Sequence, residues 1–254
     1  MYADYDGAFS GIGKAYGSVK EADSMVIYGL KKFSLLDYPG KAACTLFTAG
    51  CNFRCPYCYN APLVLDTHEN KEIPLEDIYT FLENFRGLLD GICLTGGEPM
   101  IQRGMEEFLE RVREMGYAVR LDTNGSFPDK LKRLVSEGLV SYVAMDLKNS
   151  KESYGKTVGI EGYDVGNVCK SVEYLLSGAV PYEFNTTVVL EFHQRSDFES
   201  IGRWIAGAEH YYLQRFIDSG NVIREGLHRY NEDIMHQALD IVKEKVPSAK
   251  LRGW

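Results

Sequence analysis

From residue 42 onward, short apolar runs alternate with stretches in which apolar residues recur at helical spacing. Short apolar runs are typical of buried strands, and a period near 3.6 residues is typical of a helix with one buried face. We therefore predict six strands, at residues 42–48, 91–95, 117–122, 140–146, 182–190 and 211–216. Helices are predicted between these strands, the first of them opened by Pro74, and one more around residues 234–242 beyond the sixth strand.

The alternation of strands and helices determines the expected fold class. Strands that are apolar almost throughout, each followed by a helix, predict an α/β fold in which helices cover a parallel sheet. Six such units are fewer than a closed eight-stranded barrel needs, so we expect a partial (β/α)6 barrel with parallel strands and an open lateral mouth. Sites in such folds form where the carboxyl ends of the strands meet the following loops. The distinctive polar motifs of this chain all fall at predicted strand ends.

Charge and composition exclude several classes of function. The chain has 28 Lys and Arg against 36 Asp and Glu, a formal net charge of −8, so no basic excess is available to hold a nucleic acid. No apolar run approaches the roughly 20 residues of a membrane span, and the Gly-rich start is unlike a signal peptide. We expect a cytoplasmic protein with reduced thiols and neither a membrane nor a nucleic-acid partner. Residues 1–24 are expected to form a flexible extension and residues 25–254 a single domain.

Three cysteines lie close together after the first predicted strand. Cys51, Cys55 and Cys58 have the spacing C-x3-C-x2-C. Three thiolates on one loop suit three corners of a cubane iron–sulfur cluster and leave the fourth iron open. A structural zinc ion needs four ligands, and His68 is the nearest histidine, so a zinc site with a distant His remains an alternative, as do buried thiols without function.

The cysteine motif includes an aromatic residue, Tyr57, directly before the third cysteine. In this form it resembles the signature of the radical S-adenosylmethionine (SAM) superfamily. The resemblance implies one [4Fe–4S] cluster whose open iron is chelated by the amino and carboxylate groups of SAM. It also implies reductive cleavage of SAM to a 5′-deoxyadenosyl radical that abstracts hydrogen from a substrate.

The second predicted strand ends in a glycine pair, Thr95-Gly96-Gly97-Glu98-Pro99. Glycines let a backbone approach a ligand closely, although a plain Gly-Gly turn would use the same residues. The segment resembles the GGEP motif of the same superfamily. The resemblance implies that Gly96, Gly97 and Glu98 contact the methionine part of SAM.

Carboxylates end the third and fourth predicted strands, in Asp122-Thr123-Asn124-Gly125 and Met145-Asp146-Leu147-Lys148. Each could simply cap a helix. Together they resemble segments of the activating enzymes of glycyl radical enzymes, which implies that Asp122, Thr123 and Asp146 line the cofactor pocket and that Lys148 reaches the ribose or the carboxylate. A monovalent cation binds there in some members of that branch.

The resemblance to that branch covers about residues 26–216 and includes the segment 29–41, which is similar to the activating proteins of anaerobic ribonucleoside-triphosphate reductase. Two positions depart from the branch. Tyr59, also expected in the cofactor pocket, replaces a histidine, and Asn185 replaces an arginine of the fifth strand. An amide cannot replace a bidentate guanidinium. Gln214 or Arg215 in the sixth strand is expected to give the last cofactor contact.

The resemblance implies an activase that installs a radical on a glycine of a partner enzyme, with the partner's loop inserted at the lateral mouth. Its electrons would come from reduced flavodoxin or ferredoxin under anaerobic conditions. Two alternatives remain open at this point: a radical SAM enzyme acting on a small molecule or peptide, and a zinc-stabilised binding module without catalysis.

The remaining cysteines and histidines carry no predicted chemistry. Cys44, Cys93 and Cys169 are expected to be small buried residues, and no late cysteine-rich block indicates a second cluster. The other histidines show no metal-binding spacing and are expected at the surface or in the core: His193, His210, His228 and His236.

Overall fold

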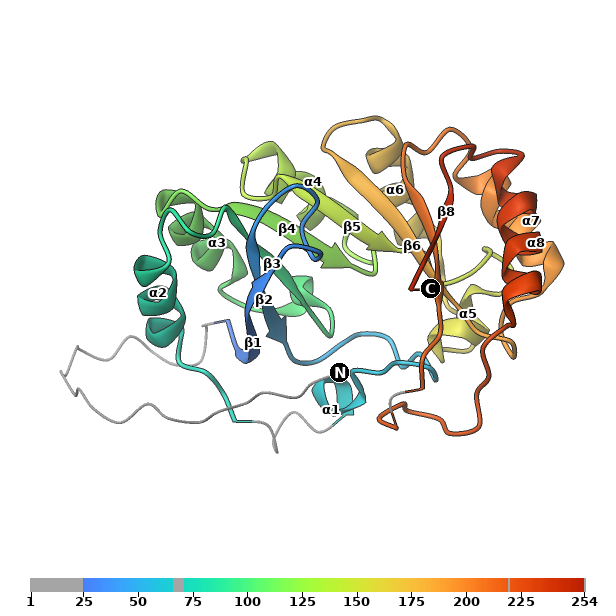
Figure 1. Cartoon of the computed structure of the whole chain (residues 1–254), viewed down its shortest axis with the longest axis horizontal. Coiled ribbons are helices and arrows are strands. Elements are labelled where there is room, and N and C mark those ends of the chain that lie inside the picture. Colours follow the sequence, from blue (N-terminus) through green and yellow to red (C-terminus); the bar gives the residue numbers. More distant parts are fainter. Residues whose placement is uncertain (1–24, 66–70, 219, 254) are drawn as a thin grey trace.

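The computed structural model describes residues 25–65, 71–218 and 220–253. Within these residues the chain forms one sheet of eight strands whose spatial order follows the sequence, from β1 to β8 (Figure 1). The strands are β1 Ile27–Ser34, β2 Ala43–Thr48, β3 Gly91–Gly96, β4 Ala118–Thr123, β5 Tyr142–Asp146, β6 Tyr182–Val188, β7 Tyr211–Arg215 and β8 Lys250–Arg252. The helices are α1 Ala61–Leu65, α2 Leu75–Asn84, α3 Met105–Glu114, α4 Pro128–Ser136, α5 Tyr154–Val158, α6 Gly166–Leu176, α7 Arg195–Trp204 and α8 Glu232–Lys243, with a 3-10 turn at Pro99–Ile101.

The sheet confirms the predicted fold class and adds two strands to it. Strands β2 to β8 are parallel and correspond, except for β8, to the six predicted strands. Strand β1 pairs antiparallel with β2, so the sheet is not parallel throughout. The sheet does not close, and β1 and β8 form its two edges within the described residues. The expected extension at residues 1–24 lies outside the residues that the structure describes.

The two unpredicted strands carry weak sequence signals. Residues 31–33 of β1 are exposed, and β8 is only 3 residues long. Edge strands are commonly short or rich in Lys, because an apolar edge would pair with other chains. The segment 35–41 follows β1 and crosses the amino ends of the strands, where Tyr38 Oη lies 2.9 Å from Ser141 Oγ and Thr45 Oγ1 donates to Asp37 at 2.6 Å.

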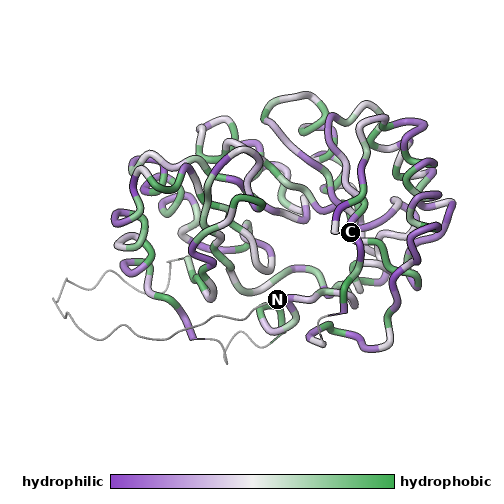
Figure 2. Tube along the Cα trace, viewed as in Figure 1, coloured by the Kyte–Doolittle hydropathy of each residue, from purple (hydrophilic) through white to green (hydrophobic). Residues whose placement is uncertain are grey.

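The two faces of the sheet differ in character. One face packs against the helices, which surround the sheet on the outside and alternate between hydrophilic and hydrophobic along each turn (Figures 1 and 2). Leu121, Val143 and Phe184 lie on this face and are fully buried in the main core. The opposite, concave face carries polar side chains, because alternate residues of a strand point to opposite faces. No helix in the described part of the chain is long and apolar enough to cross a membrane.

Candidate active site

The cysteine loop follows β2 and is held in place mainly by backbone contacts. Arg54 N donates to Val158 O on α5 at 2.9 Å, and Arg54 Nη1 donates to Cys51 O at 2.6 Å. The ring of Phe53 is buried and packs edge-on against Tyr163, with 5.1 Å between the ring centroids. The loop is therefore fixed against α5 independently of the three thiols.

The thiols of this loop lie in a setting that disfavours free thiolates. Burial raises the pKa of Cys51 to about 11 and that of Cys55 to about 12, and it also raises the pKa of Cys58. The Lys148 ammonium opposes this effect at all three sulfurs, so it lies near the whole set. Buried thiols of this kind give up their protons when a metal binds them as thiolates.

The donor set, three cysteines on one loop, is compatible with a cubane cluster. Among the residues that the structure describes, no three His, Cys, Asp or Glu converge as closely as the ligands of one metal ion do. In a cubane cluster each cysteine binds a different iron, so the sulfurs stand farther apart. His68, which the zinc alternative would use, lies outside the described residues.

Gly96 and Gly97 allow two loops to pack together. A Cβ atom at Gly97 would clash with the backbone of Gly50, and one at Gly96, where φ is +124°, would clash with the backbone of Thr48. Gly97 N donates to Thr48 O at 2.9 Å, and Glu98 N donates to Gly50 O at 2.8 Å. The space freed by the glycines is thus taken by the chain itself, and this packing places the start of the cysteine loop beside the end of β3.

Glu98 joins the ends of β3 and β4. The side chain is fully buried, and its carboxylate accepts from Thr123 Oγ1 at 2.8 Å, Asn124 N at 2.7 Å and Met100 N at 3.2 Å. Burial raises the pKa of this carboxyl to about 7, against the effect of these three donors. The carboxylate is engaged by these three donors and therefore positions Thr123 and Asn124.

Replacing Glu98 with glutamine should lower the stability of the protein by about 1–3 kcal/mol. The amide would present N–H groups to backbone donors that need an acceptor, and an unsatisfied buried polar group has about this cost. Urea unfolding followed by circular dichroism measures the change. Glu114→Gln, at an exposed position of α3, is the matched control and should leave the midpoint unchanged; equal midpoints in both variants would refute the positioning role.

The ends of β4 and β5 bring the remaining predicted residues to the concave face. Lys148 Nζ lies 2.8 Å from Asp146 Oδ2, and Asp122 Oδ1 accepts from Arg120 Nε at 2.8 Å. Burial disfavours the charge on Lys148, but Asp146, Tyr57 and Cys55 outweigh it and raise the pKa of the ammonium well above its usual value. Lys148 is therefore a fixed cation between the acidic strand ends and the cysteine loop.

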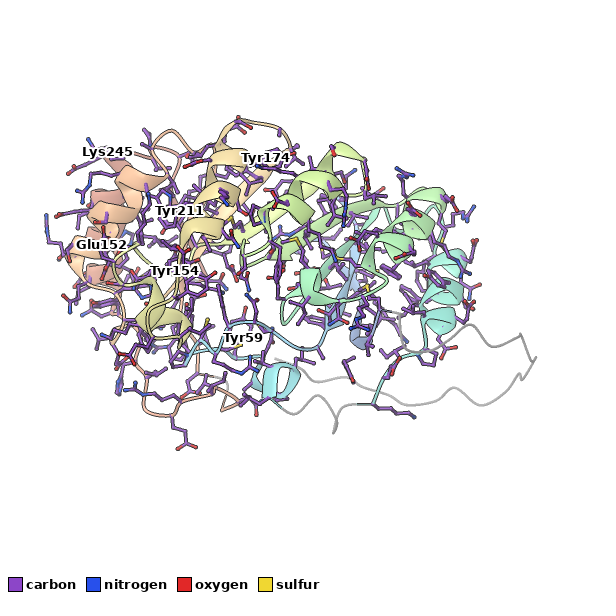
Figure 3. All side chains as sticks on the ribbon, turned by 180° about the vertical axis from the view of Figure 1, so that it is seen from behind. Tyr59, Glu152, Tyr154, Tyr174, Tyr211 and Lys245 are labelled. Atoms are coloured by element: carbon purple, nitrogen blue, oxygen red, sulfur yellow. The ribbon has the colours of Figure 1, made fainter. Side chains whose placement is uncertain are left out.

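The two predicted tyrosines occupy different environments. Tyr57 is buried against Phe192, with 5.8 Å between the ring centroids, and its hydroxyl has no hydrogen-bond partner among the described residues. A buried hydroxyl without a partner fits a site that a bound cofactor completes. Tyr59 lies just before α1 and is partly exposed (Figure 3).

A buried histidine contacts the backbone of Lys148. His193 is fully buried, and its Nε2 lies 2.9 Å from Lys148 O. His228 and His236 are exposed, as expected for residues without a ligand role. Cys44 and Cys93 are buried as predicted, whereas Cys169 on α6 is only half-buried, so the expectation of a buried residue is wrong at this position.

Sequence reasoning missed three charged residues on the concave face, Arg120, Glu183 and Arg252. With Asp122 and Asn185 they form a set here called the lumen network. Glu183 is its centre and accepts from Arg120 Nη2 at 3.0 Å, from Arg252 Nη1 at 2.7 Å and from Arg252 Nη2 at 3.1 Å. Arg252 Nη1 also donates to Asn185 Oδ1 at 2.8 Å. The sequence does carry a signal for this network. Polar residues alternate with apolar ones at positions 120 and 122 of one strand and at positions 183 and 185 of another.

Known proteins resemble this chain in sequence. A family profile described as the radical SAM superfamily matches residues 45–205. A protein of Methanocaldococcus jannaschii, provisionally described as a glycyl-radical enzyme activating enzyme, is 30% identical over 195 residues, which are 75% of this chain and 80% of that protein. Two further curated relatives are matched over only 54% and 46% of their own lengths.

Solved structures agree with the fold. A domain of a pyruvate-formate lyase-activating enzyme from Bacteroides vulgatus has a TM-score of 0.52 at 15% identity, over 64% of this chain and 99% of that one. SuiB of Streptococcus suis, solved with its precursor peptide, has a TM-score of 0.64 at 13% identity, over 82% of this chain and 48% of that one. Related structures hold S-adenosylmethionine. The chain therefore belongs to the radical SAM superfamily, whose enzymes use a [4Fe–4S] cluster and S-adenosylmethionine.

Proposed function

We propose that this enzyme is an activase that abstracts hydrogen from a glycine of a partner enzyme and so installs a glycyl radical. The observation that carries the proposal is the relative described as a glycyl-radical enzyme activating enzyme, which matches three quarters of this chain and four fifths of its own length. The sheet is not closed between its edge strands β1 and β8, which is compatible with a protein substrate whose loop would enter there.

The residues at the carboxyl ends of the strands have distinct proposed roles. Cys51, Cys55 and Cys58 would hold the cluster, and when bound the cluster and SAM supply hydrogen-atom abstraction. Lys148 would orient the cofactor's carboxylate or ribose through its fixed charge, and Tyr57 would donate its free hydroxyl. Glu98 would hold Thr123 and Asn124 in place.

The other predicted residues would complete the pocket. Gly96 and Gly97 would shape its floor by packing on the cysteine loop, and Tyr59 would cover its outer side. Asp122 and Asp146, both partly exposed on the concave face, are the carboxylates that would take a monovalent cation. Reduced flavodoxin or ferredoxin would supply the electron, because cleaving a sulfonium needs a potential near the low end of the range for clusters.

A second candidate is a radical SAM enzyme that acts on a peptide or a small molecule. Asn185 and Tyr59 favour it, because both differ from the activase pattern. The fold similarity to SuiB, which is solved with a precursor peptide, is compatible with it.

Electron paramagnetic resonance separates the two candidates. The anaerobically reconstituted protein is mixed with SAM, a reductant and the glycyl radical enzyme encoded nearest to it. We expect a glycine-centred doublet that disappears when the partner's radical-site glycine is replaced by alanine. Production of 5′-deoxyadenosine without any doublet on the partner would contradict the activase assignment, and stoichiometric zinc in place of iron would contradict both candidates.

A further inference from the structure

Arg252 is the member of the lumen network that lies on the last strand, β8, at the open edge of the sheet. Its guanidinium is held by Glu183 and Asn185, and its Cζ lies 3.6 Å from the centre of the Tyr212 ring. A guanidinium that is both stacked and bonded as a fork loses little freedom when it makes a further bond. The side chain is therefore already fixed in one orientation.

The bonds of Arg252 leave part of its donor capacity available. A guanidinium has five N–H groups, and residues of the described chain accept three of those of Arg252. The side chain is 36% exposed, whereas those of Glu183 and Arg120 are 1% and 9% exposed. Glu183 and Arg120 are thus the buried support, and Arg252 is the group that faces open space.

The pairing of the strands places this group beside the cofactor site. Asn185, which Arg252 contacts, is the register neighbour of Asp146 on β5, and Asp146 binds Lys148. Neighbours in a parallel sheet share a face, so Arg252 and the cofactor-site residues border the same space. A molecule bound on this face between β8 and the cofactor site would therefore border Arg252.

We infer that Arg252 orients the substrate by donating its two remaining N–H groups to an oxygen acceptor, a peptide carbonyl or a carboxylate. The inference depends on the proposed function only for the choice of a peptide as the first probe. Asn185 supports this role, because its amide oxygen accepts from Arg252 Nη1 across the intervening strand β7 and so helps to fix the guanidinium. Because the Arg252 guanidinium is already fixed, it would favour substrates whose oxygen lies in line with its N–H groups. Hydrogen bonds to a charged group weaken steeply when they are misaligned.

The test measures binding to the reconstituted enzyme with SAM bound. The probes are a fluorescein-labelled 15-residue peptide with one central glycine, read by anisotropy, and N-acetylglycinate, read by displacement of that peptide or by calorimetry. We expect Arg252→Ala to weaken binding of one probe at least about 10-fold, as the loss of charged hydrogen bonds does, and Arg252→Lys to fall in between. Lys250→Ala, at the exposed neighbouring position of β8, should bind like the wild type.

Iron content and SAM affinity serve as structural controls, and both should be unchanged in Arg252→Ala. An Arg252-dependent loss for the peptide identifies a carbonyl ligand, and one for N-acetylglycinate alone identifies a small carboxylate. Equal affinities of wild type and Arg252→Ala for both probes, or no binding of either, would overturn the inference. Absence of a glycine-centred doublet with intact Arg252-dependent binding would instead reject the activase function and leave this role standing.

Discussion

Replacing Cys55 with alanine should abolish cluster binding and, with it, all production of 5′-deoxyadenosine. Cys55 is the most buried of the three cysteines of the loop, and burial raises its pKa to about 12, so the free side chain favours the protonated thiol and a bound cluster would stabilise the thiolate. The loop itself should remain in place, because the contacts of Phe53 and Arg54 that hold it do not involve the sulfur. Iron and sulfide analysis after anaerobic reconstitution, followed by chromatography of the nucleoside products, measures both effects.

Cys169→Ala is the matched control for this experiment. Cys169 is also a free cysteine, but it lies half-buried on α6 and outside the cysteine loop. This variant should retain full iron content and nucleoside production. Equal losses in both variants would mean that the cluster uses other thiols.

Replacing Glu183 with alanine should destabilise the protein by about 3–5 kcal/mol, the cost of leaving a buried charge without its partner. Glu183 is almost inaccessible and receives both Arg120 and Arg252, together with the hydroxyl of Tyr142 at 3.1 Å. Urea unfolding measures the loss. Glu83→Ala removes a surface ion pair with Arg86 and should cost less than about 1 kcal/mol. A similar small cost in both variants would refute a structural role for the lumen network.

The same carboxylate predicts a dependence of stability on pH. Burial disfavours its charge, but Arg252 and Arg120 outweigh burial and lower the pKa of Glu183 from 4.5 to about 2. The unfolded chain then binds a proton more readily than the folded one, so the stabilisation is complete above pH 4.5 and is lost as the pH falls toward 2. Unfolding curves at pH 6 and pH 3 should show this loss, and it should be smaller in Glu183→Gln.

The sequence predicted six of the eight strands because apolar runs are a local pattern, and the spacing of the cysteines is local as well. Six parallel strands and the cysteine loop followed from apolar runs and spacing, and the structure confirmed the strands. Strands β1 and β8 escaped prediction, since edge strands are stabilised by pairing and not by their own hydrophobicity. Two short helices, α1 and α5, were also missed, since 5 residues are too few to show a period.

The sequence indicated candidate residues for the site, but it did not indicate the contacts that these residues make with one another. Glu98 was predicted as a member of the site, but its partners Thr123 and Asn124 come from another loop, so its hydrogen bonds are visible only in the fold. Arg252 lies 67 positions from Asn185, and no local pattern joins them. Their contact depends on the register of β6, β7 and β8, which is set by pairing across the whole sheet.

The close packing of Gly97 on Gly50 has a consequence for exchanging segments between relatives. A Cβ atom at position 97 has no room beside the backbone of Gly50, whereas Phe53 and Arg54 hold the cysteine loop through side-chain contacts of their own. A chimera that imports residues 51–58 from a distant homologue should therefore assemble its metal centre when it keeps these two residues. A chimera with a larger residue at position 97 should not, because the new side chain would push the start of the cysteine loop out of place.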